Sequence, residues 1–309
     1  MNTSNFMFLF YVKARRLLKS FLFLLFSENS KIINLFVNFD VFFRKILLFK
    51  SSLKGEFNFD GLKFLHDKSD ISVASSVLIN GTYEPELLNE IYKTLKTGYC
   101  FIDGGANIGF FSLIASKIVG QSGTVISFEP TPLTHTYLKK NININNASNI
   151  TISKYGLSSS KKQLPFQMFG NPEGNSIISD KASKLTDENE IIQIKTISID
   201  EFCTENKIKR INLIKLDIEG QELEAIKGAK KVLSENHSIK IIFELNIAGN
   251  KHGIDFAKKI FDELIKLNFS NFQTLLNPRN NINDLNDNKN VKLLKKITDR
   301  HNVNILATR

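Results

Sequence analysis

The segment F-I-D-G-G-A-N-I-G-F-F-S, residues 101–112, constrains the fold of this chain more than any other. Residues 99–103 have the apolar composition of a buried strand, and residues 109–119 have that of an apolar helix. Between them, Gly104 and Gly105 permit a sharp turn and a close approach of the backbone to a ligand. A strand that passes through such a turn into a helix is typical of α/β folds.

The same order of strand and helix is repeated along most of the chain. Further strands are predicted at residues 124–129, 150–152, 191–196, 211–217, 240–245, 272–276 and 303–308. Further helices are predicted at residues 84–95, 133–143, 199–205, 221–227 and 254–267. Two short strands at 62–66 and 71–74 precede this pattern, a polar surface loop at 170–190 interrupts it, and an Asn/Asp-rich loop separates the last two strands. The alternation predicts a doubly wound, mostly parallel α/β sheet.

The first fifty residues differ from the rest in charge and aromatic content. They hold eight Lys and Arg against two acidic residues, and 11 of the 26 Phe. On a helical wheel the first four cations lie opposite a row of Phe and Leu, which is typical of a basic amphipathic helix on an anionic membrane surface. Packing on the main domain or on a second subunit, and a signal anchor, are the alternatives. We divide the chain into an amphipathic helical extension (1–50), lead-in strands and a helix (51–97), and a main domain (98–309).

Composition narrows the classes of function. The net charge is +10, but most of this excess lies in residues 1–50, whereas a nucleic-acid binder carries its charge on the folded domain. We therefore expect no nucleic-acid partner. The two cysteines, Cys100 and Cys203, provide neither a disulfide framework nor a thiolate zinc site. We expect two buried free thiols in a reducing compartment.

Acidic residues stand where two of the predicted strands end. Asp103 lies at the glycine turn, where a carboxylate would repel a diphosphate and favours a ligand with a positive centre or free hydroxyls. Glu129 ends the next strand, twenty residues after Gly109, a spacing at which an acid binds the ribose hydroxyls in two-strand nucleotide sites. His135, in the first turn of the following helix, is interpreted as a surface residue, with contact to a nucleoside as the alternative.

A third polar cluster is predicted in I-K-L-D-I-E-G-Q-E-L-E-A-I-K-G-A, residues 214–229. Lys215, Asp217 and Glu219 alternate, so they share one face as long as the strand persists. Charges there are costly unless they line a pocket, or unless Lys215 forms a salt bridge with either acid. Glu244 ends the next strand and is expected to face the same crevice, whereas the helix residues 222 and 224 are expected to be solvated glutamates.

These motifs resemble those of the FkbM-type methyltransferases. The resemblance rests on D-G-G-A-N-I-G-x-F-S, F-E-P-T-P, K-L-D-I-E-G-Q-E-L-E-A-I-K-G-A and the following F-E-L, preceded by N-G-T-Y-E-P-E at residues 80–86. It extends from about residue 75 to residue 309 and does not cover residues 1–55. Gly104 departs from the family, in which a β-branched residue is common, and we interpret the change as conservative.

The resemblance implies a seven-stranded, Rossmann-like methyltransferase fold over residues 98–309 and S-adenosylmethionine as the methyl donor. It implies that the donor loop is formed by Asp103, Gly105, Ala106, Asn107 and Gly109. Glu129 would hold the ribose, and Asp217, Glu219 and Lys215 would lie beside the transferring methyl group.

Methyl transfer to a hydroxyl needs a base, for which Asp217 is the first choice and Glu219 the second, with Lys215 keeping one of them ionised. No metal is expected, because ligand spacing of the His/Cys type is missing. The predicted acceptor is a hydroxyl on a glycan or glycolipid, with a lipid headgroup or a secondary metabolite as the alternatives and residues 170–190 as its lid. The predicted location is cytoplasmic, with the tail on the inner face of the membrane. An inactive methyltransferase-like scaffold that docks on membranes is the alternative.

Overall fold

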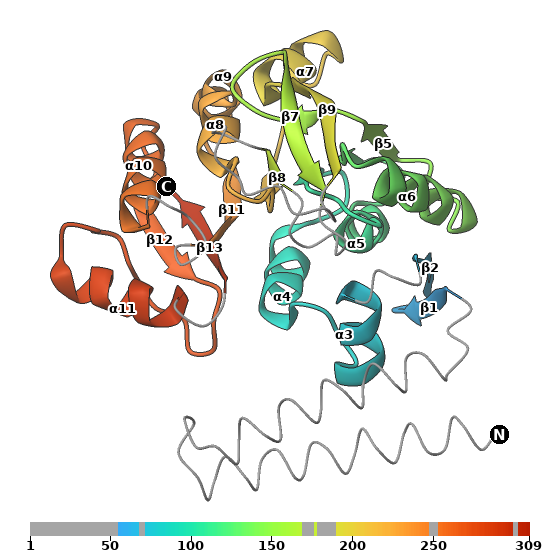
Figure 1. The fold of residues 1–309 in the computed structure, drawn as a ribbon, viewed down its shortest axis with the longest axis horizontal. Coiled ribbons are helices and arrows are strands. Elements are labelled where there is room, and N and C mark those ends of the chain that lie inside the picture. Colours follow the sequence, from blue (N-terminus) through green and yellow to red (C-terminus); the bar gives the residue numbers. More distant parts are fainter. Residues whose placement is uncertain (1–54, 68–71, 169–175, 178–189, 247–252, 299–301) are drawn as a thin grey trace, which may run out of the picture. The chain divides into compact units, whose positions relative to one another are not determined.

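The computed structural model of the protein describes residues 55–67, 72–168, 176–177, 190–246, 253–298 and 302–309 (Figure 1). The chain divides into two compact units, residues 1–61 with 65–83, and residues 62–64 with 84–309. The amphipathic extension predicted for residues 1–50 lies outside the described residues. None of the described helices combines the length and the apolar character that a membrane crossing requires.

The lead-in contains strand β1 (Glu56–Phe59), strand β2 (Leu62–Leu65) and helix α3 (Ser72–Asn80). Strand β2 confirms the strand predicted at 62–66. The strand predicted at 71–74 is wrong, because Ser72 begins α3. The β-branched valines suggested a strand, but Val73 and Val77 are buried at a spacing of four residues, which is the period of a helix.

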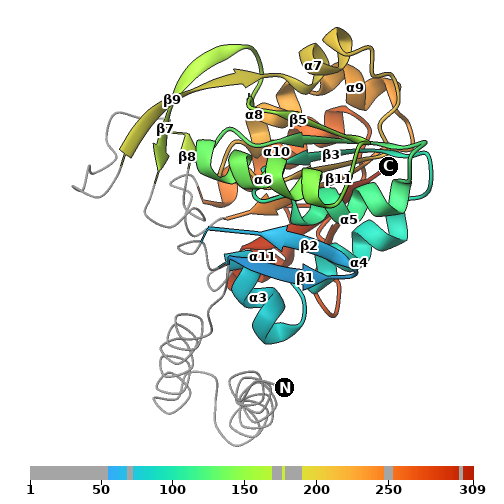
Figure 2. The same cartoon turned by 90° about the vertical axis from the view of Figure 1, so that its right-hand side faces the viewer.

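The second unit is built on a seven-stranded sheet with the order β12-β13-β11-β10-β3-β4-β5 (Figures 1 and 2). The strands are β3 (Cys100–Gly104), β4 (Thr124–Phe128), β5 (Ile150–Ser153), β10 (Leu213–Leu216), β11 (Lys240–Leu245), β12 (Asn271–Thr274) and β13 (Val303–Thr308). Strands β5, β4, β3, β10 and β11 pair in parallel, whereas β13 is antiparallel to both β11 and β12. This arrangement confirms the predicted doubly wound, mostly parallel α/β fold.

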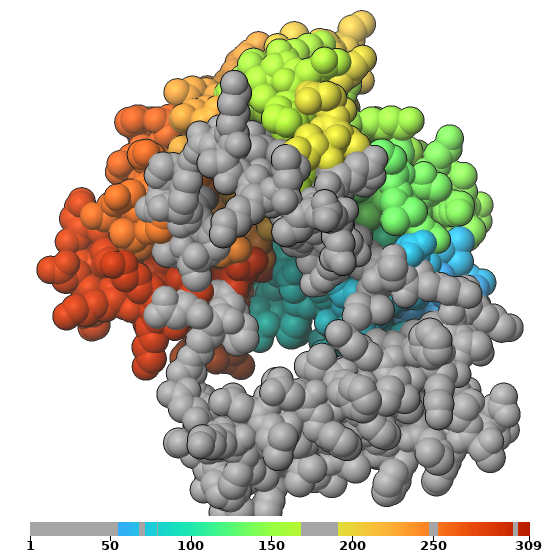
Figure 3. Space-filling view, viewed as in Figure 1, coloured from blue at the N-terminus to red at the C-terminus, as the bar shows by residue number. Residues whose placement is uncertain are grey.

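Helices cover this sheet, and all those predicted in the second unit are present. They are α4 (Pro85–Thr94), α5 (Phe110–Val119), α6 (Pro132–Ile144), α7 (Ile199–Glu205), α8 (Glu222–Lys227), α9 (Lys230–Glu235), α10 (Ile254–Lys266) and α11 (Asn288–Thr298). Helices α9 and α11 were not predicted, and the Asn- and Lys-rich sequence of α11 resembles a loop. Figure 3 shows the red α11 region on one flank and green α6 on the other, as the strand order requires.

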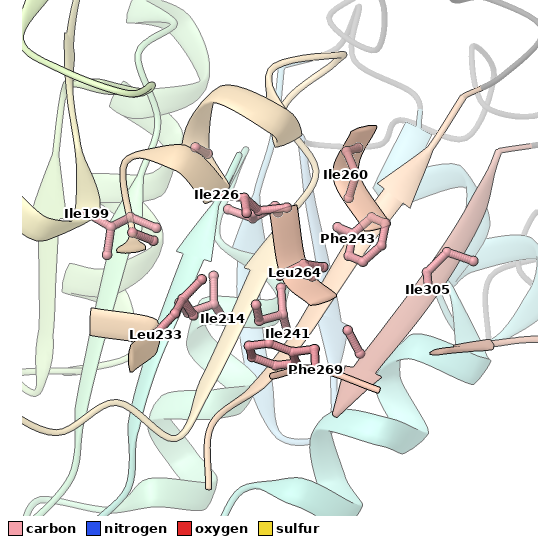
Figure 4. Packing of buried hydrophobic residues seen from close by; sticks show 14 of the residues in the cluster. Ile199, Ile214, Ile226, Leu233, Ile241, Phe243, Ile260, Leu264, Phe269 and Ile305 are labelled. Carbon is pink, nitrogen blue, oxygen red and sulfur yellow. The ribbon is translucent and has the colours of Figure 1, made fainter. Parts of the chain in front are cut away.

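The main hydrophobic core lies between one face of the sheet and helices α7 to α10 (Figure 4). Alternate residues of the strands, such as Ile214 and Ile241, point toward this core. Both predicted free thiols are confirmed there, since Cys100 and Cys203 are buried and unpaired. The remaining strand residues point to the opposite face, which α5 covers, and this face carries the polar groups of the site.

A second, four-stranded sheet has the order β6-β9-β7-β8. Its strands are β6 (Gly156–Leu157), β7 (Lys162–Met168), β8 (Ser176–Ile177) and β9 (Glu190–Ile197). Strand β9 confirms the strand predicted at 191–196, but β7 was missed because Pro165 interrupts its pattern. The predicted loop at 170–190 is wrong at Ser176–Ile177, which pairs with β7, and most of its other residues lie outside those described. Figure 2 shows β7 and β9 extending beyond the main sheet.

Candidate active site

The glycine turn between β3 and α5 is hydrogen-bonded to the end of β4. The amides of Gly105 and Ala106 both donate to the carbonyl of Phe128, at 3.0 Å. Gly105, Asn107 and Gly109 all have positive φ angles, of 73°, 50° and 89°. A Cβ atom on Gly105 would lie 1.9 Å from the carbonyl oxygen of Asp217, so only glycine allows the turn to pass this close to the end of β10.

Leucine side chains from two strands pack against Gly104. A Cβ atom at this position would lie 2.8 Å from Cδ1 of Leu157 and 3.1 Å from both Cδ2 of Leu216 and the carbonyl oxygen of Lys215. The volume that a β-branched side chain would need is therefore filled by leucine side chains from β6 and β10. The sequence motif alone gives no sign of this, because Leu157 lies about fifty residues away.

Glu129 follows β4 and is almost fully buried. Its Oε2 accepts from the amide of Asn107 and its Oε1 from the amide of Thr131, both at 2.9 Å. Burial raises the pKa of Glu129, and these hydrogen bonds oppose the shift. The surface position predicted for His135 is wrong, since its ring is buried and its Nδ1 lies 3.1 Å from the carbonyl oxygen of Glu129.

The surroundings of Glu129 leave room and polar groups for a ligand. Oδ1 of Asn107 is buried, and no hydrogen bond reaches it from the described residues. A hollow of about 550 Å³ is lined by His135, Thr136, Lys139, Ile152 and Lys154. It lies between helix α6 and the carboxyl end of β5, beside His135.

A row of polar side chains crosses the sheet beneath α5. Ser127, Asp103 and Lys215 are register partners on the adjacent strands β4, β3 and β10. The hydroxyl of Ser127 donates to that of Ser112 at 2.7 Å, and Ser112 donates to Oδ2 of Asp103 at 2.6 Å. The carboxylate of Asp103 is fully buried and turned toward α5. Its charge is therefore balanced by protein groups.

Lys215 connects this row to the end of β10. Its Nζ lies 3.3 Å from Oδ1 of Asp103 and 3.4 Å from Oδ2 of Asp217, and its side chain is 2% exposed. The same atom lies 3.3 Å from the carbonyl oxygen of Gly105 and 5.5 Å from the ring centre of Phe111. Burial lowers the pKa of Lys215, but the two carboxylates outweigh burial and raise it overall. The salt bridge with an acid, which the sequence left open as an alternative, is present with Asp217, and Asp103 is a second partner that the sequence did not indicate.

Acidic side chains gather where β10 and β11 end. The prediction that the strand continues to Asp217 is wrong, because β10 ends at Leu216 and Glu219 is left-handed, with φ of 53°. Carboxylate oxygens of Asp217, Glu219 and Glu244 nevertheless lie within 4.8 Å of one another. Burial, and then Asp217, Glu219 and Glu84, raise the pKa of Glu244 to about 9. The expectation that Glu244 shares this crevice is confirmed.

The two glutamates of α8 behave differently from each other. Glu222 was expected to be solvated, which is wrong, since it is 2% exposed and accepts from the amides of Ile218 and Gly220 at 3.1 and 3.3 Å. Burial raises its pKa to about 7. Glu224 remains half-exposed and pairs with Lys227 at 2.7 Å. Glu222 therefore caps the turn that follows Asp217.

Comparison with known proteins identifies a family model that matches more than half of the chain. A model of the methyltransferase FkbM domain matches residues 103–270. Methyltransferase sdnD of Sordaria araneosa is 31% identical over 175 residues, covering 45% of this chain and 67% of its own. Hexuronic acid methyltransferase AglP of Haloferax volcanii is 34% identical over 131 residues, covering 42% of this chain and 50% of its own. The chain thus spans about half to two thirds of these relatives. A crystal structure of methyltransferase FkbM from Methylobacillus flagellatus KT matches 71% of this chain and 52% of its own, with 20% identity and a TM-score of 0.37.

Proposed function

The chain belongs to the FkbM methyltransferase family, and from that premise we propose that it transfers the methyl group of S-adenosylmethionine to a hydroxyl oxygen. The observation that carries the proposal is that two groups of residues, the two halves of the candidate site, meet at the carboxyl ends of the parallel strands. The glycine turn and Glu129 form a donor half, and Lys215, Asp217 and Glu219 form an acceptor half. The carbonyl of Asp217 touches the turn, so the two halves are in direct contact.

The residues of the donor half fit S-adenosylmethionine. Glu129 is held by two backbone amides, and each of its oxygens keeps a lone pair for a ribose hydroxyl. The buried, unpartnered Oδ1 of Asn107 is a ready acceptor for a ligand donor. Gly105, Ala106 and Gly109 bring the backbone close without a large side chain in the way. Asp103 supports the turn from beneath through Lys215, which also contacts the carbonyl of Gly105.

When bound, S-adenosylmethionine supplies a methyl group on a positively charged sulfur, and that carbon–sulfur bond breaks with its electron pair left on sulfur. The chain's own residues have two tasks. They must position the acceptor oxygen in line with the methyl carbon, and they must take the proton that the oxygen loses.

Asp217 is the base in this proposal. It is about one quarter exposed, so an acceptor can reach it, and the ammonium of Lys215 lies 3.4 Å from its Oδ2. The ion pair holds this carboxylate in place, where it can receive the proton of the acceptor. Glu219 lies in the same cluster and is the second candidate for this task. Lys215 is buried beneath both and therefore acts as a positioning residue.

The acid cluster favours a neutral hydroxyl over a carboxylate as the acceptor. A carboxylate needs no base and would be repelled by Asp217 and Glu219. A glycan or glycolipid hydroxyl is our choice, and a relative whose name refers to hexuronic acid supports a sugar acceptor.

The experiment supplies radiolabelled S-adenosylmethionine and the full chain to the polysaccharide, lipid and small-molecule fractions of a cell extract. We expect one sugar-containing fraction to gain label in a form that resists mild alkaline hydrolysis, as an ether does and an ester does not. Calorimetry with S-adenosylmethionine is done in parallel. Absence of binding would favour the alternative of an inactive scaffold.

We propose in addition that the protein is cytoplasmic and that residues 1–50 hold it on the inner face of the membrane. Their eight cations and eleven Phe support this. The full chain should sediment with vesicles of anionic lipid, be partly released by high salt and be stripped by alkaline carbonate. A chain that starts at residue 51 should stay in solution and still bind the donor. Resistance to carbonate would instead indicate a spanning anchor.

A further inference from the structure

Glu244 is a member of the acidic cluster to which the proposed chemistry assigns no task. It ends β11, next to the end of β10, and its carboxylate oxygens approach those of Asp217 and Glu219 within 4.8 Å. The amide nitrogen of Asn302 donates to its Oε2 at 2.9 Å. The groups that face Glu244 are Asp217 and Glu219 from the end of β10, Glu84 before α4, and Asn302 before β13.

Three carboxylates at this spacing repel one another, and the available counter-charge is unevenly placed. Lys215 pairs with Asp217 at 3.4 Å, so the negative charge is best held there. Among the described residues, no ion pair reaches Glu244. Glu244 is partly buried, and its pKa of about 9 means that it keeps its proton at neutral pH. Asn302 occupies Oε2, which leaves the other oxygen to face the cluster.

We propose that Glu244 is a further residue of the methyl-transfer site, and that its neutral carboxyl group donates a hydrogen bond to a second oxygen of the acceptor, next to the oxygen that Asp217 deprotonates. This inference rests on the proposed function. It narrows the acceptor to a molecule with two adjacent oxygens, such as a vicinal diol of a sugar ring. Two such oxygens can reach Asp217 and Glu244 together, because the carboxyl groups are so close.

The two carboxyl groups then have complementary tasks. Asp217 receives the proton of the attacked hydroxyl as the new carbon–oxygen bond forms. Glu244 keeps its proton throughout, and it orients the acceptor by donating a hydrogen bond to the second oxygen. A neutral donor and an ionised base can stand side by side without the repulsion that two charged carboxylates would have.

The test uses two variants of the full chain. Glu244→Gln keeps a donor of nearly the same shape, whereas Glu244→Leu removes the donor. With the labelled extract fraction as the acceptor probe, Glu244→Gln should retain transfer within about threefold, and Glu244→Leu should lose about tenfold or more. Both must bind S-adenosylmethionine by calorimetry as the unchanged chain does, which shows that the leucine variant is folded.

The pH profile and the infrared spectrum report whether Glu244 is protonated. Transfer by the unchanged chain should fall as the pH rises above about 9, where Glu244 ionises, and Glu244→Gln should lack this decline. At pH 8 the carbonyl stretch of a protonated carboxyl group should be present and should disappear in Glu244→Gln. Periodate, which cleaves vicinal diols, should abolish the acceptor capacity of the fraction.

Four results would overturn the inference. These are a missing carboxylic acid band at pH 8, a glutamine variant as inactive as the leucine variant, a fraction that still accepts methyl after periodate, and transfer that stops with EDTA and returns with Mg²⁺. The last would mean that a cation, not a proton, relieves the repulsion. A chain that binds no S-adenosylmethionine would instead contradict the proposed function, with the infrared result unaffected.

Discussion

Two glutamates at the carboxyl ends of the parallel strands β4 and β11 show how differently one fold can treat a carboxyl group. Glu129 in the donor half receives two backbone amides at 2.9 Å, whereas Glu244 in the acceptor half receives one side-chain amide and faces three other acids. Backbone donors organise the donor half before any ligand arrives, and charge balance between side chains organises the acceptor half. The difference predicts that changes in the donor half alter binding, while changes in the acceptor half alter turnover.

The contact between the halves should be the most sensitive point. Gly105→Ala places a Cβ atom 1.9 Å from the carbonyl oxygen of Asp217, which belongs to the backbone and cannot rotate away. We expect a loss of about 3 kcal/mol or more in the free energy of unfolding, together with loss of donor binding. Thermal unfolding and calorimetry measure the two effects.

Gly61→Ala is the matched control for this prediction. Gly61 has a φ of +78°, close to the +73° of Gly105, but a Cβ atom there meets nothing within 4 Å. It should cost only the strain of a left-handed alanine, about 1 kcal/mol. Equal losses in the two variants would show that the φ angle, and not the contact with Asp217, sets the requirement for glycine.

The largest effect on chemistry is expected at Asp217. Asp217→Asn keeps the shape but removes the charge that pairs with Lys215 and receives the proton. Turnover should fall by about 10²-fold or more, while S-adenosylmethionine binds within a few-fold of the unchanged chain. If Asp217→Asn is nearly fully active and Glu219→Gln is inactive, the two residues exchange roles.

Glu129 should show the opposite division between binding and turnover. Glu129→Ala removes the partner of the Asn107 and Thr131 amides and the proposed partner of the ribose. Donor affinity should fall at least about tenfold, measured by calorimetry. Glu224→Ala, at a half-exposed glutamate of α8, is the control and should leave the affinity unchanged. Unchanged affinity in Glu129→Ala would contradict the ribose assignment.

The local geometry of the glycine turn could be predicted from the sequence and many contacts across the sheet could not, for a physical reason. The glycine turn is local, so its residues are consecutive in the chain, and their pattern predicts a strand, a turn and a helix. The partners of Lys215 depend on strand order, because Asp103 becomes its neighbour only when β10 pairs with β3. The filling of space beside Gly104 by Leu157 likewise depends on the placement of β6.

The same reasoning explains the errors at single residues. His135 and Glu222 are polar residues in first helical turns, positions that are usually solvated, and both are buried because their helices begin against the ends of strands. Helix α11 and strand β7 were missed because local composition, rich in Asn and Lys or interrupted by Pro165, concealed their periodicity. Tertiary packing decided these cases, and local propensity did not.

The smallest effect is expected beneath the acceptor half, at Glu222, and it concerns stability. Its pKa is about 7 in the folded chain against an ordinary value of 4.5, so the folded state binds the proton more tightly. Stability from this group is fully present below pH 4.5 and is lost as the pH rises to 7. The full pKa difference corresponds to about 3 kcal/mol in the free energy of unfolding. We expect an effect of about 1 kcal/mol, because a buried carboxylate draws in water and relaxes.

Glu222→Gln, which keeps an acceptor for the amides of Ile218 and Gly220, should therefore match the unchanged chain near pH 4.5 and be more stable above pH 7. Glu224→Gln should behave in the opposite way, because Lys227 lowers the pKa of Glu224 against the effect of burial. A difference between Glu222→Gln and the unchanged chain that stays constant from pH 4.5 to 8 would show that Glu222 does not titrate in this range.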